Sequence, residues 1–288
     1  MTMTTTKVKT WGDALDYTWR VKWKRMNSAK TNAINAGHVT NYGGRSLPLK
    51  RLTVAGWWME MRAEMEDQGR NGSTINRILS AGTTVMKFTK LAGLHEYVCP
   101  QFERAKEGEH RLTYYTKEQI DQLAAISRDL YGHTWGDAMA DAILVSAYTG
   151  VRQGELLKLR STDIDVALDQ LWVGGKPTLV TKGRNCRNIA LHPKIKGILM
   201  DRLDQTFLFK DDWNNKDQLY GAFMKVRKAA GITEDYVWHT LRHSFGTFLG
   251  ETTHPRQIMA LMGHANIETS LRYVKATDAA TRSAVLAI

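Results

Sequence analysis

The chain has 288 residues, 43% hydrophobic and 24% charged, a balance that excludes an intrinsically disordered protein. Its net charge of +11 favours a polyanionic partner, nucleic acid first and an anionic membrane surface second. The sequence has no apolar run near the roughly 20 residues that span a bilayer and no secretory signal, so we expect a soluble protein without a membrane partner. Cys99 and Cys186 lie in no metal-binding or redox spacing, which favours a reduced, cytoplasmic compartment.

The first part of the chain has the pattern of a small helical domain. Residues 1–10 are polar and rich in Thr, and we expect them to be flexible. Apolar residues then recur every three or four positions, which is typical of amphipathic helices. The stretches with this spacing are 11–26, 54–65 and 74–91. With a break expected at 37–48, residues 11–98 are predicted to form an all-helical domain.

A linker is expected next, over residues 99–111, which are charged and poor in large aliphatic side chains. The second domain then covers residues 112–288. It begins with a capping box formed by Thr116 and Gln119, ahead of a helical stretch. The nearly all-apolar segment 135–150 predicts a buried helix that Gly150 closes.

The periodicity changes after this helix. Short runs rich in β-formers at 169–175, 177–182 and 186–192 predict a small antiparallel sheet with a hairpin tip at 183–185. Helices are then predicted over 193–203, 217–230, 239–251, 256–262 and 267–273, with a short one after Asp278. The expected fold class is therefore mainly α with one small antiparallel β-sheet.

The segment HTLRHSFGTFLG, residues 239–250, concentrates polar chemistry on one predicted helix. His239 and Arg242 are three positions apart and share a face. His239 and His243 have the spacing of helical zinc ligands, but the zinc-protease pattern needs Glu directly after the first His, where Thr240 stands. An ordinary core helix with polar caps, and an acid–base and phosphate-binding cluster, are the other interpretations.

Three further segments favour the interpretation as an acid–base and phosphate-binding cluster. In YTGVRQGE, Arg152 follows the Gly150 cap and Glu155 can orient its guanidinium, although such a pair is commonly a surface salt bridge. In MGHANIETSLRY, His264 follows a helix end and Tyr273 lies in a short polar helix. In TKGRNCR, Lys182 precedes a basic hairpin tip flanked by Arg184 and Arg187, which is either simply solvated or reaches into a DNA groove.

Taken in order, TGVRQGE, a Lys at a β-hairpin, HTLRH, MGH and a following Tyr resemble the tyrosine recombinase family of phage-integrase-like site-specific recombinases. The resemblance covers the whole second domain, and the helical first domain is similar to the family's core-binding domain in size and position. It implies a helical core DNA-binding domain followed by a catalytic domain. The catalytic set carried over by position is Arg152, Lys182, His239, Arg242, His264 and Tyr273, with Glu155 as an accessory acid.

The chemistry that the resemblance implies is strand exchange through a 3′-phosphotyrosine. Tyr273 would be the nucleophile, Arg152 and Arg242 would clamp the phosphate, and His264 would donate to it. His239 would move the nucleophile's proton, and Lys182 would protonate the leaving oxygen. No metal, ATP or other cofactor is expected.

The implied partners are double-stranded DNA, held by a clamp of the two domains, and sister protomers in a homotetramer on that DNA. A DNA-bending accessory protein is a further partner in many such systems. The basic and aromatic-rich helices would face the phosphates. The apolar tail after Tyr273 would dock on a neighbouring protomer or on its own domain. A phage- or element-encoded protein would act in the cytoplasm of a bacterial host.

Two alternatives keep the DNA partner. A type IB topoisomerase shares the tyrosine, arginine and lysine chemistry but works alone, and the MGH histidine and the short chain favour a recombinase. A non-catalytic DNA-binding protein could retain the fold, but the nucleophile and both arginines are present. The predicted function is site-specific recombination, as in a phage or mobile-element integrase.

Overall fold

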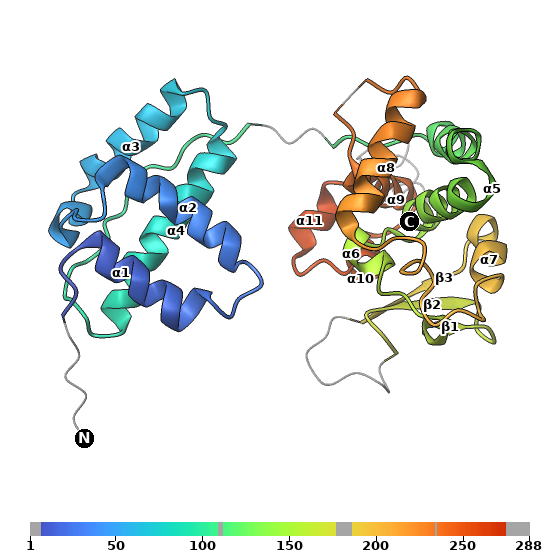
Figure 1. The fold of residues 1–288 in the computed structure, drawn as a ribbon, viewed down its shortest axis with the longest axis horizontal. Coiled ribbons are helices and arrows are strands. Elements are labelled where there is room, and N and C mark those ends of the chain that lie inside the picture. Colours follow the sequence, from blue (N-terminus) through green and yellow to red (C-terminus); the bar gives the residue numbers. More distant parts are fainter. Residues whose placement is uncertain (1–6, 109–111, 177–185, 234, 275–288) are drawn as a thin grey trace, which may run out of the picture. The chain divides into compact units, whose positions relative to one another are not determined.

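The computed structural model describes residues 7–108, 112–176, 186–233 and 235–274. The chain divides into two compact units, Met1–His110 and Arg111–Ile288, which are described separately (Figure 1). Within the described residues, no helix is both long and apolar enough to cross a membrane.

The first unit is helical, as predicted. Its helices are α1 (Trp11–Thr18), continued by a π-helical turn (Trp19–Trp23), α2 (Ala29–Gly43), α3 (Ala55–Asp67), preceded by a 3₁₀ turn (Leu49–Thr53), and α4 (Gly72–Leu91). Side-chain caps start two of them: Thr10 Oγ1 accepts from the Asp13 N–H, and Asn71 Oδ1 accepts from the Thr74 N–H. These caps fix where α1 and α4 begin.

The break expected at 37–48 is wrong in its first half, because α2 continues to Gly43. The chain leaves the helix only at Gly44, whose φ of +79° suits glycine. The buried residues of α2 are Ala36 and Val39, both small, and the rest of the helix is largely polar. Its apolar stripe was therefore too sparse to show in the sequence.

Most tryptophans of the first unit lie in its core, whereas Trp19 is 38% exposed. Trp11, Trp23, Trp57 and Trp58 are all buried. The Trp58 ring stacks on Phe102 with 5.3 Å between ring centroids, and its Nε1–H donates to a backbone carbonyl. These rings supply much of the apolar area that the unit buries, and whether the helices that carry them face DNA stays a prediction.

Part of the segment expected as a linker is packed on the first unit. Phe102 lies on Trp58, and Ala105 is buried. The Asn76 side chain fixes the Ala105 backbone by donating to its carbonyl at 2.9 Å and accepting from its N–H at 3.0 Å. Because this segment is mostly charged, its composition does not predict these contacts.

The second unit is built around the long helix α5. Its helices are α5 (Lys117–Thr149), α6 (Gln153–Leu156), α7 (Pro193–Met200), α8 (Lys216–Ala229), α9 (Trp238–Gly250), α10 (Pro255–Met262) and α11 (Ile267–Leu271), with a 3₁₀ turn (Ser161–Asp163). Two predicted caps are confirmed, one at each end of α5: Thr116 and Gln119 form the capping box, and Gly150 is the left-handed cap. Gly132 interrupts α5 with non-helical backbone angles.

The small antiparallel sheet is confirmed and contains a strand that the sequence did not indicate. Its strands are β1 (Ile164–Asp165), β2 (Gln170–Val173) and β3 (Arg187–Ala190), in that order. Leu171 pairs with Ile189 in the register of β2 and β3. At two residues, β1 is too short to produce an alternating pattern. The predicted run 177–182, the tip 183–185 and the helix after Asp278 lie outside the described residues.

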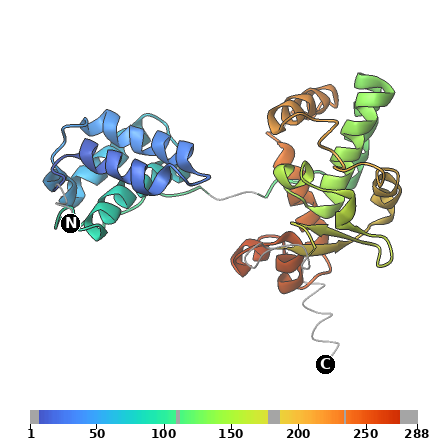
Figure 2. The same cartoon turned by 60° about the horizontal axis from the view of Figure 1, so that its bottom comes forward.

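The helices that carry the polar motifs gather at one side of the second unit. Helix α9 packs on α5, α10 contacts both α9 and β3, and α11 contacts α10. These last helices are coloured orange to red in Figure 2. Residues that are far apart in the sequence therefore meet beside α9, as Gly150 and Arg242 do across 92 positions.

Candidate active site

Arg242 is the most enclosed polar residue of the site. Its side chain projects from α9 and donates to the carbonyls of Gly150 and Met262, which end α5 and α10. Only 2% of the residue is exposed. Burial, followed by the charges of Arg152 and Arg187, lowers the pKa of Arg242 to about 10, so it stays charged at neutral pH.

The Gly150 backbone allows this arrangement. Its φ is +61°, and a Cβ at this position would collide with the ring of Phe245 on α9. A glycine at the end of α5 thus lets α9 approach closely enough for Arg242 to reach the Gly150 carbonyl.

Glu155 joins two arginines. It accepts from Arg152 Nη1 at 2.9 Å and from Arg187 Nη2 at 2.7 Å. The backbone N–H of Arg152 donates to the same carboxylate at 2.8 Å. The predicted contact between Arg152 and Glu155 is confirmed, and the Arg152 side chain remains about half exposed.

Arg187 differs from the expectation of a solvated or groove-binding tip residue. It begins β3, and its side chain is only 6% exposed because it points inward to Glu155. The alternating pattern of β3, with Arg187 and Ile189 on the buried side, places it there. Arg184 and Lys182 lie outside the described residues, so the position of Lys182 stays a prediction.

The Glu155 carboxylate should make stability depend on pH. Burial raises its pKa, but hydrogen bonds from Arg187 and Arg152 outweigh this and hold the pKa at about 2, below the ordinary 4.5. A lowered folded-state pKa gives stability that is complete above pH 4.5 and is lost as pH falls toward 2. This difference corresponds to roughly 3 kcal/mol of the free energy of unfolding.

We therefore expect the stability advantage of wild type over Glu155→Gln to shrink between pH 4.5 and 2. Urea denaturation of both proteins across this range measures it, and the Asp137→Asn variant of an exposed ion pair is the control. An advantage that stays constant from pH 5 to 2 would contradict the assignment.

Tyr273 follows α11 and is buried, with 4% exposed. Its hydroxyl lies 2.8 Å from His243 Nδ1. The His264 ring stacks on the tyrosine ring at 6.0 Å between centroids, and His264 Nδ1 contacts Ser270 Oγ at 2.8 Å. Burial raises the pKa of Tyr273, while the charges of Arg242 and Arg272 act in the opposite direction.

The three histidines of the site all have pKa values below the ordinary value for histidine. Partial burial, and then the charge of Arg242, lowers the pKa of His264 to about 4. Burial and neighbouring cations also lower the pKa of His243 and of His239, although the His239 side chain keeps an exposed surface. All three imidazoles are therefore neutral at pH 7 and can accept protons.

The structure thus gathers five of the six residues of the predicted set. Arg152, His239, Arg242, His264 and Tyr273 lie in one electrostatically coupled group of the second unit. The residues that sequence reasoning missed are Arg187 and His243. The sequence pattern indicates His243 only as a possible zinc ligand, because its partner Tyr273 lies 30 residues later in the chain.

The zinc interpretation finds no further ligands in the described residues. His239 and His243 do adjoin, with 4.9 Å between their ring centroids. No group of three or more His, Cys, Asp or Glu residues in the described ranges could hold a metal ion.

Comparisons with known proteins point in one direction. The model of the phage integrase family matches residues 113–280. A tyrosine recombinase of Thermosipho africanus is 26% identical over 281 residues, covering 91% of this chain and 93% of that protein. The tyrosine recombinase XerC of Alcanivorax borkumensis is 27% identical over 244 residues, or 79% of this chain and 76% of that protein.

Solved structures share the fold. The Tn1549 transposon integrase in complex with transposon right end DNA superposes with a TM-score of 0.76 at 17% identity, covering 97% of this chain and 100% of that one. A lambda integrase tetramer bound to a Holliday junction gives 0.70 at 17% identity, covering 92% of this chain and 77% of that one.

Proposed function

The chain belongs to the phage integrase family, and from this premise we propose that it recombines DNA at specific sites through a 3′-phosphotyrosine on Tyr273. One observation carries the assignment of the residue. The Tyr273 hydroxyl lies with Arg242, His243 and His264 in one group, although the tyrosine follows α11 and the others lie on or beside α9 and α10.

The proposed step exchanges one phosphodiester for another. Tyr273 Oη attacks the phosphorus, the bond from phosphorus to the 5′ oxygen breaks, and the DNA 3′ phosphate stays on the tyrosine. The leaving 5′ oxygen takes a proton from Lys182. A 5′ hydroxyl of the partner strand then attacks the phosphotyrosine and releases Tyr273. Because the bond energies are similar, neither water nor ATP is needed.

The arginines provide positive charge where the transition state builds negative charge. Arg242 uses two N–H groups on backbone carbonyls, and a guanidinium has five, so others remain for a phosphate. Glu155 holds Arg152 from one side and leaves much of its side chain exposed. Preorganised donors of this kind need no reorganisation during the reaction.

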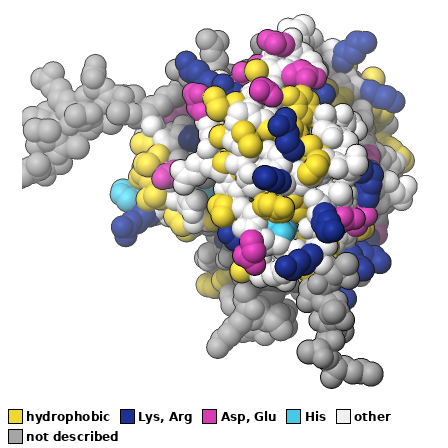
Figure 3. All heavy atoms as spheres, turned by 90° about the vertical axis from the view of Figure 1, so that its left-hand side faces the viewer, with side chains coloured by type: hydrophobic (Ala, Val, Ile, Leu, Met, Phe, Trp, Pro, Cys, Tyr) yellow, Lys and Arg dark blue, Asp and Glu magenta, His cyan; other side chains and the backbone are white. Residues whose placement is uncertain are grey.

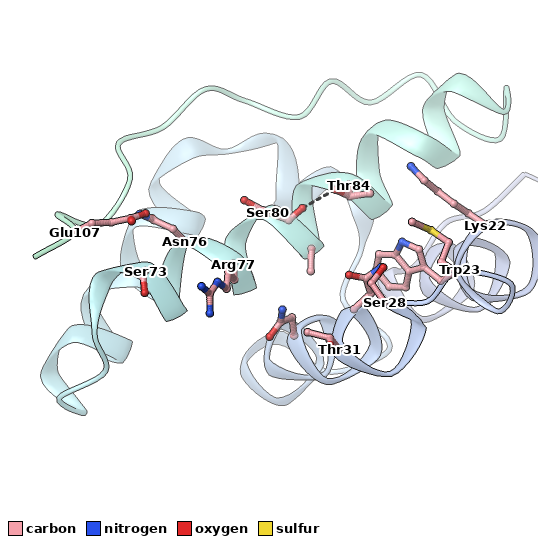
Figure 4. Close-up of a pocket in the computed structure, with 14 residues that line it drawn as sticks. Lys22, Trp23, Ser28, Thr31, Ser73, Asn76, Arg77, Ser80, Thr84 and Glu107 are labelled. Atoms are coloured by element: carbon pink, nitrogen blue, oxygen red, sulfur yellow. Dashed lines mark hydrogen bonds between the residues drawn. The ribbon is translucent and has the colours of Figure 1, made fainter. Parts of the chain in front are cut away.

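We further propose that the hollow between α2 and α4 of the first unit contacts DNA. This cavity of about 600 Å³ is lined mostly by hydrogen-bonding and basic side chains. In Figure 4, Arg77 projects from α4 on the side that faces α2, while Glu107 and Asn76 lie at one end, joined by a hydrogen bond of 2.8 Å. Ser, Thr, Asn and Arg side chains can reach both phosphates and base edges.

Charge does not mark a DNA contact on the face of the first unit that Figure 3 shows. Seen from the side of the first unit, Lys and Arg side chains are interspersed with acidic and hydrophobic ones (Figure 3). The polar lining of the cavity is therefore the stronger support for a DNA contact.

Arg77 tests the proposed contact. We expect Arg77→Ala to weaken DNA binding and to lower the slope of log affinity against log salt by about one, as for a lost phosphate contact. Arg45→Ala, which removes a guanidinium paired with Asp16 outside the cavity, is the control. Fluorescence anisotropy at several salt concentrations measures both, and equal effects of the two variants would contradict the interface.

Assembly on DNA is part of the same proposal. Exchange between two duplexes needs four active sites, so we propose a homotetramer on double-stranded DNA, and the lambda integrase tetramer supports this. The tail that would join protomers lies outside the described residues. An accessory DNA-bending protein and action in a bacterial cytoplasm remain parts of the proposal.

The reaction class is tested by the product. With a nicked DNA substrate in excess chelator and without ATP, we expect a covalent protein–DNA adduct that leaves a free 5′ hydroxyl, because arginines carry the charge. A denaturing gel detects the adduct, and end-labelling identifies the free terminus. Cleavage that needs added zinc or magnesium and leaves no protein on the DNA would indicate a hydrolase instead.

A further inference from the structure

His243 contacts the reacting atom of the proposed nucleophile. Its Nδ1 lies 2.8 Å from Tyr273 Oη, a hydrogen-bonding distance. His239 instead meets the His243 ring edge to face, with 4.9 Å between centroids. Of the two histidines of HTLRH, His243 is therefore the one hydrogen-bonded to the phenol.

The contact is built into α9 and its neighbour. Gly246 lies three positions after His243, and a Cβ there would come within 2.6 Å of the Tyr273 ring. Gly250, four positions further, would collide with the Tyr273 carbonyl if it carried a Cβ. His243, Gly246 and Gly250 share one helix face, so two glycines make the space in which the tyrosine lies and the histidine receives its hydroxyl.

We propose that His243 is the catalytic residue that accepts the proton of Tyr273, an inference that rests on the proposed function. As Oη bonds to phosphorus, the phenolic proton moves to His243 Nδ1, and the electron pair of the broken bond leaves with the 5′ oxygen. In the second half, the imidazolium returns this proton to Oη as the phosphotyrosine bond breaks. No other reactant is required.

The surroundings of His243 suit this role. Burial and the charges of Arg242 and Arg272 lower its pKa, so the imidazole is neutral and its Nδ1 can accept when Tyr273 donates. The same cations lower the pKa of Tyr273 and partly offset the effect of burial. His239 keeps an exposed surface and is available to the phosphate.

The test separates proton transfer from positioning. His243→Asn places an amide near Nδ1, where it can still hydrogen-bond to the phenol but cannot take its proton. We expect the rate of adduct formation on nicked DNA to fall by roughly 10²–10⁴-fold, the range for lost acid–base catalysis. The same substitution is made at two other histidines for comparison: His239→Asn at the neighbouring histidine of the site, and His133→Asn at an exposed histidine away from it.

Chemical rescue is the decisive readout. A fluorinated tyrosine at position 273 is ionised near neutral pH and needs no base. When both proteins carry it, the ratio of the His243→Asn rate of adduct formation to the wild-type rate should rise at least tenfold. If His243→Asn does not fold, as judged by its melting curve, His243→Gln with the same rescue replaces it.

The outcomes separate the two proposals. A rate for the folded variant within twofold of wild type, or a loss that fluorotyrosine does not relieve, would overturn the role of His243. Rescue by fluorotyrosine in His239→Asn but not in His243→Asn would also overturn the role of His243. Absence of any adduct in wild type would instead overturn the proposed function itself.

Discussion

Tyr273→Phe is expected to abolish covalent attachment to DNA while leaving the fold and DNA binding unchanged. Phenylalanine keeps the ring that packs on His264 and Gly246, and it removes only the hydroxyl that contacts His243. Loss of that hydrogen bond costs about 1 kcal/mol of stability. Loss of the nucleophile removes the reaction, so no adduct should form on a nicked substrate.

Tyr236→Phe is the matched control, since Tyr236 packs edge to face on Tyr115 at 4.9 Å in the same unit. It should form the adduct at the wild-type rate. Adduct formation by Tyr273→Phe would mean that another residue attacks the phosphorus.

Replacement of Arg242 by Ala is expected to reduce both rate and stability. Removal of one preorganised donor to a developing negative charge typically costs 10²–10³-fold in rate. The carbonyls of Gly150 and Met262 would also lose their buried partner, which costs about 1–3 kcal/mol for each group left unpaired. Single-turnover cleavage and urea denaturation measure the two effects.

Arg152→Ala separates the two contributions. The Arg152 side chain is about half exposed, and without it Glu155 still pairs with Arg187. We expect a similar loss of rate and little loss of stability. A cleavage rate within threefold of wild type in either variant would show that the arginine does not contact the phosphate.

The sequence predicted correctly those features that depend on residues close together in the chain. The capping box of Thr116, the Gly150 cap and the contact of Arg152 with Glu155 each depend on residues a few positions apart. Recognition of the ordered motifs also located Arg242, His264 and Tyr273 without knowledge of the fold.

Features that depend on tertiary packing were not predictable in this way. Arg187 is buried because β3 directs it to Glu155, 32 residues earlier in the chain. His243 meets Tyr273 because Gly246 and Gly250 open the surface of α9, a contact that spans 30 residues. Helix α2 was hidden because its buried residues are few and small. In each case a distant partner determines the structure, and local periodicity carries no record of it.

Direct identification of the attached residue tests the central claim. The wild-type protein is trapped on a nicked DNA, the adduct is digested with nuclease and protease, and the peptide that retains a nucleotide is sequenced by mass spectrometry. The account predicts a nucleotide 3′ phosphate on Tyr273. A nucleotide on any other residue, or DNA cleaved with no nucleotide left on the protein, would contradict it.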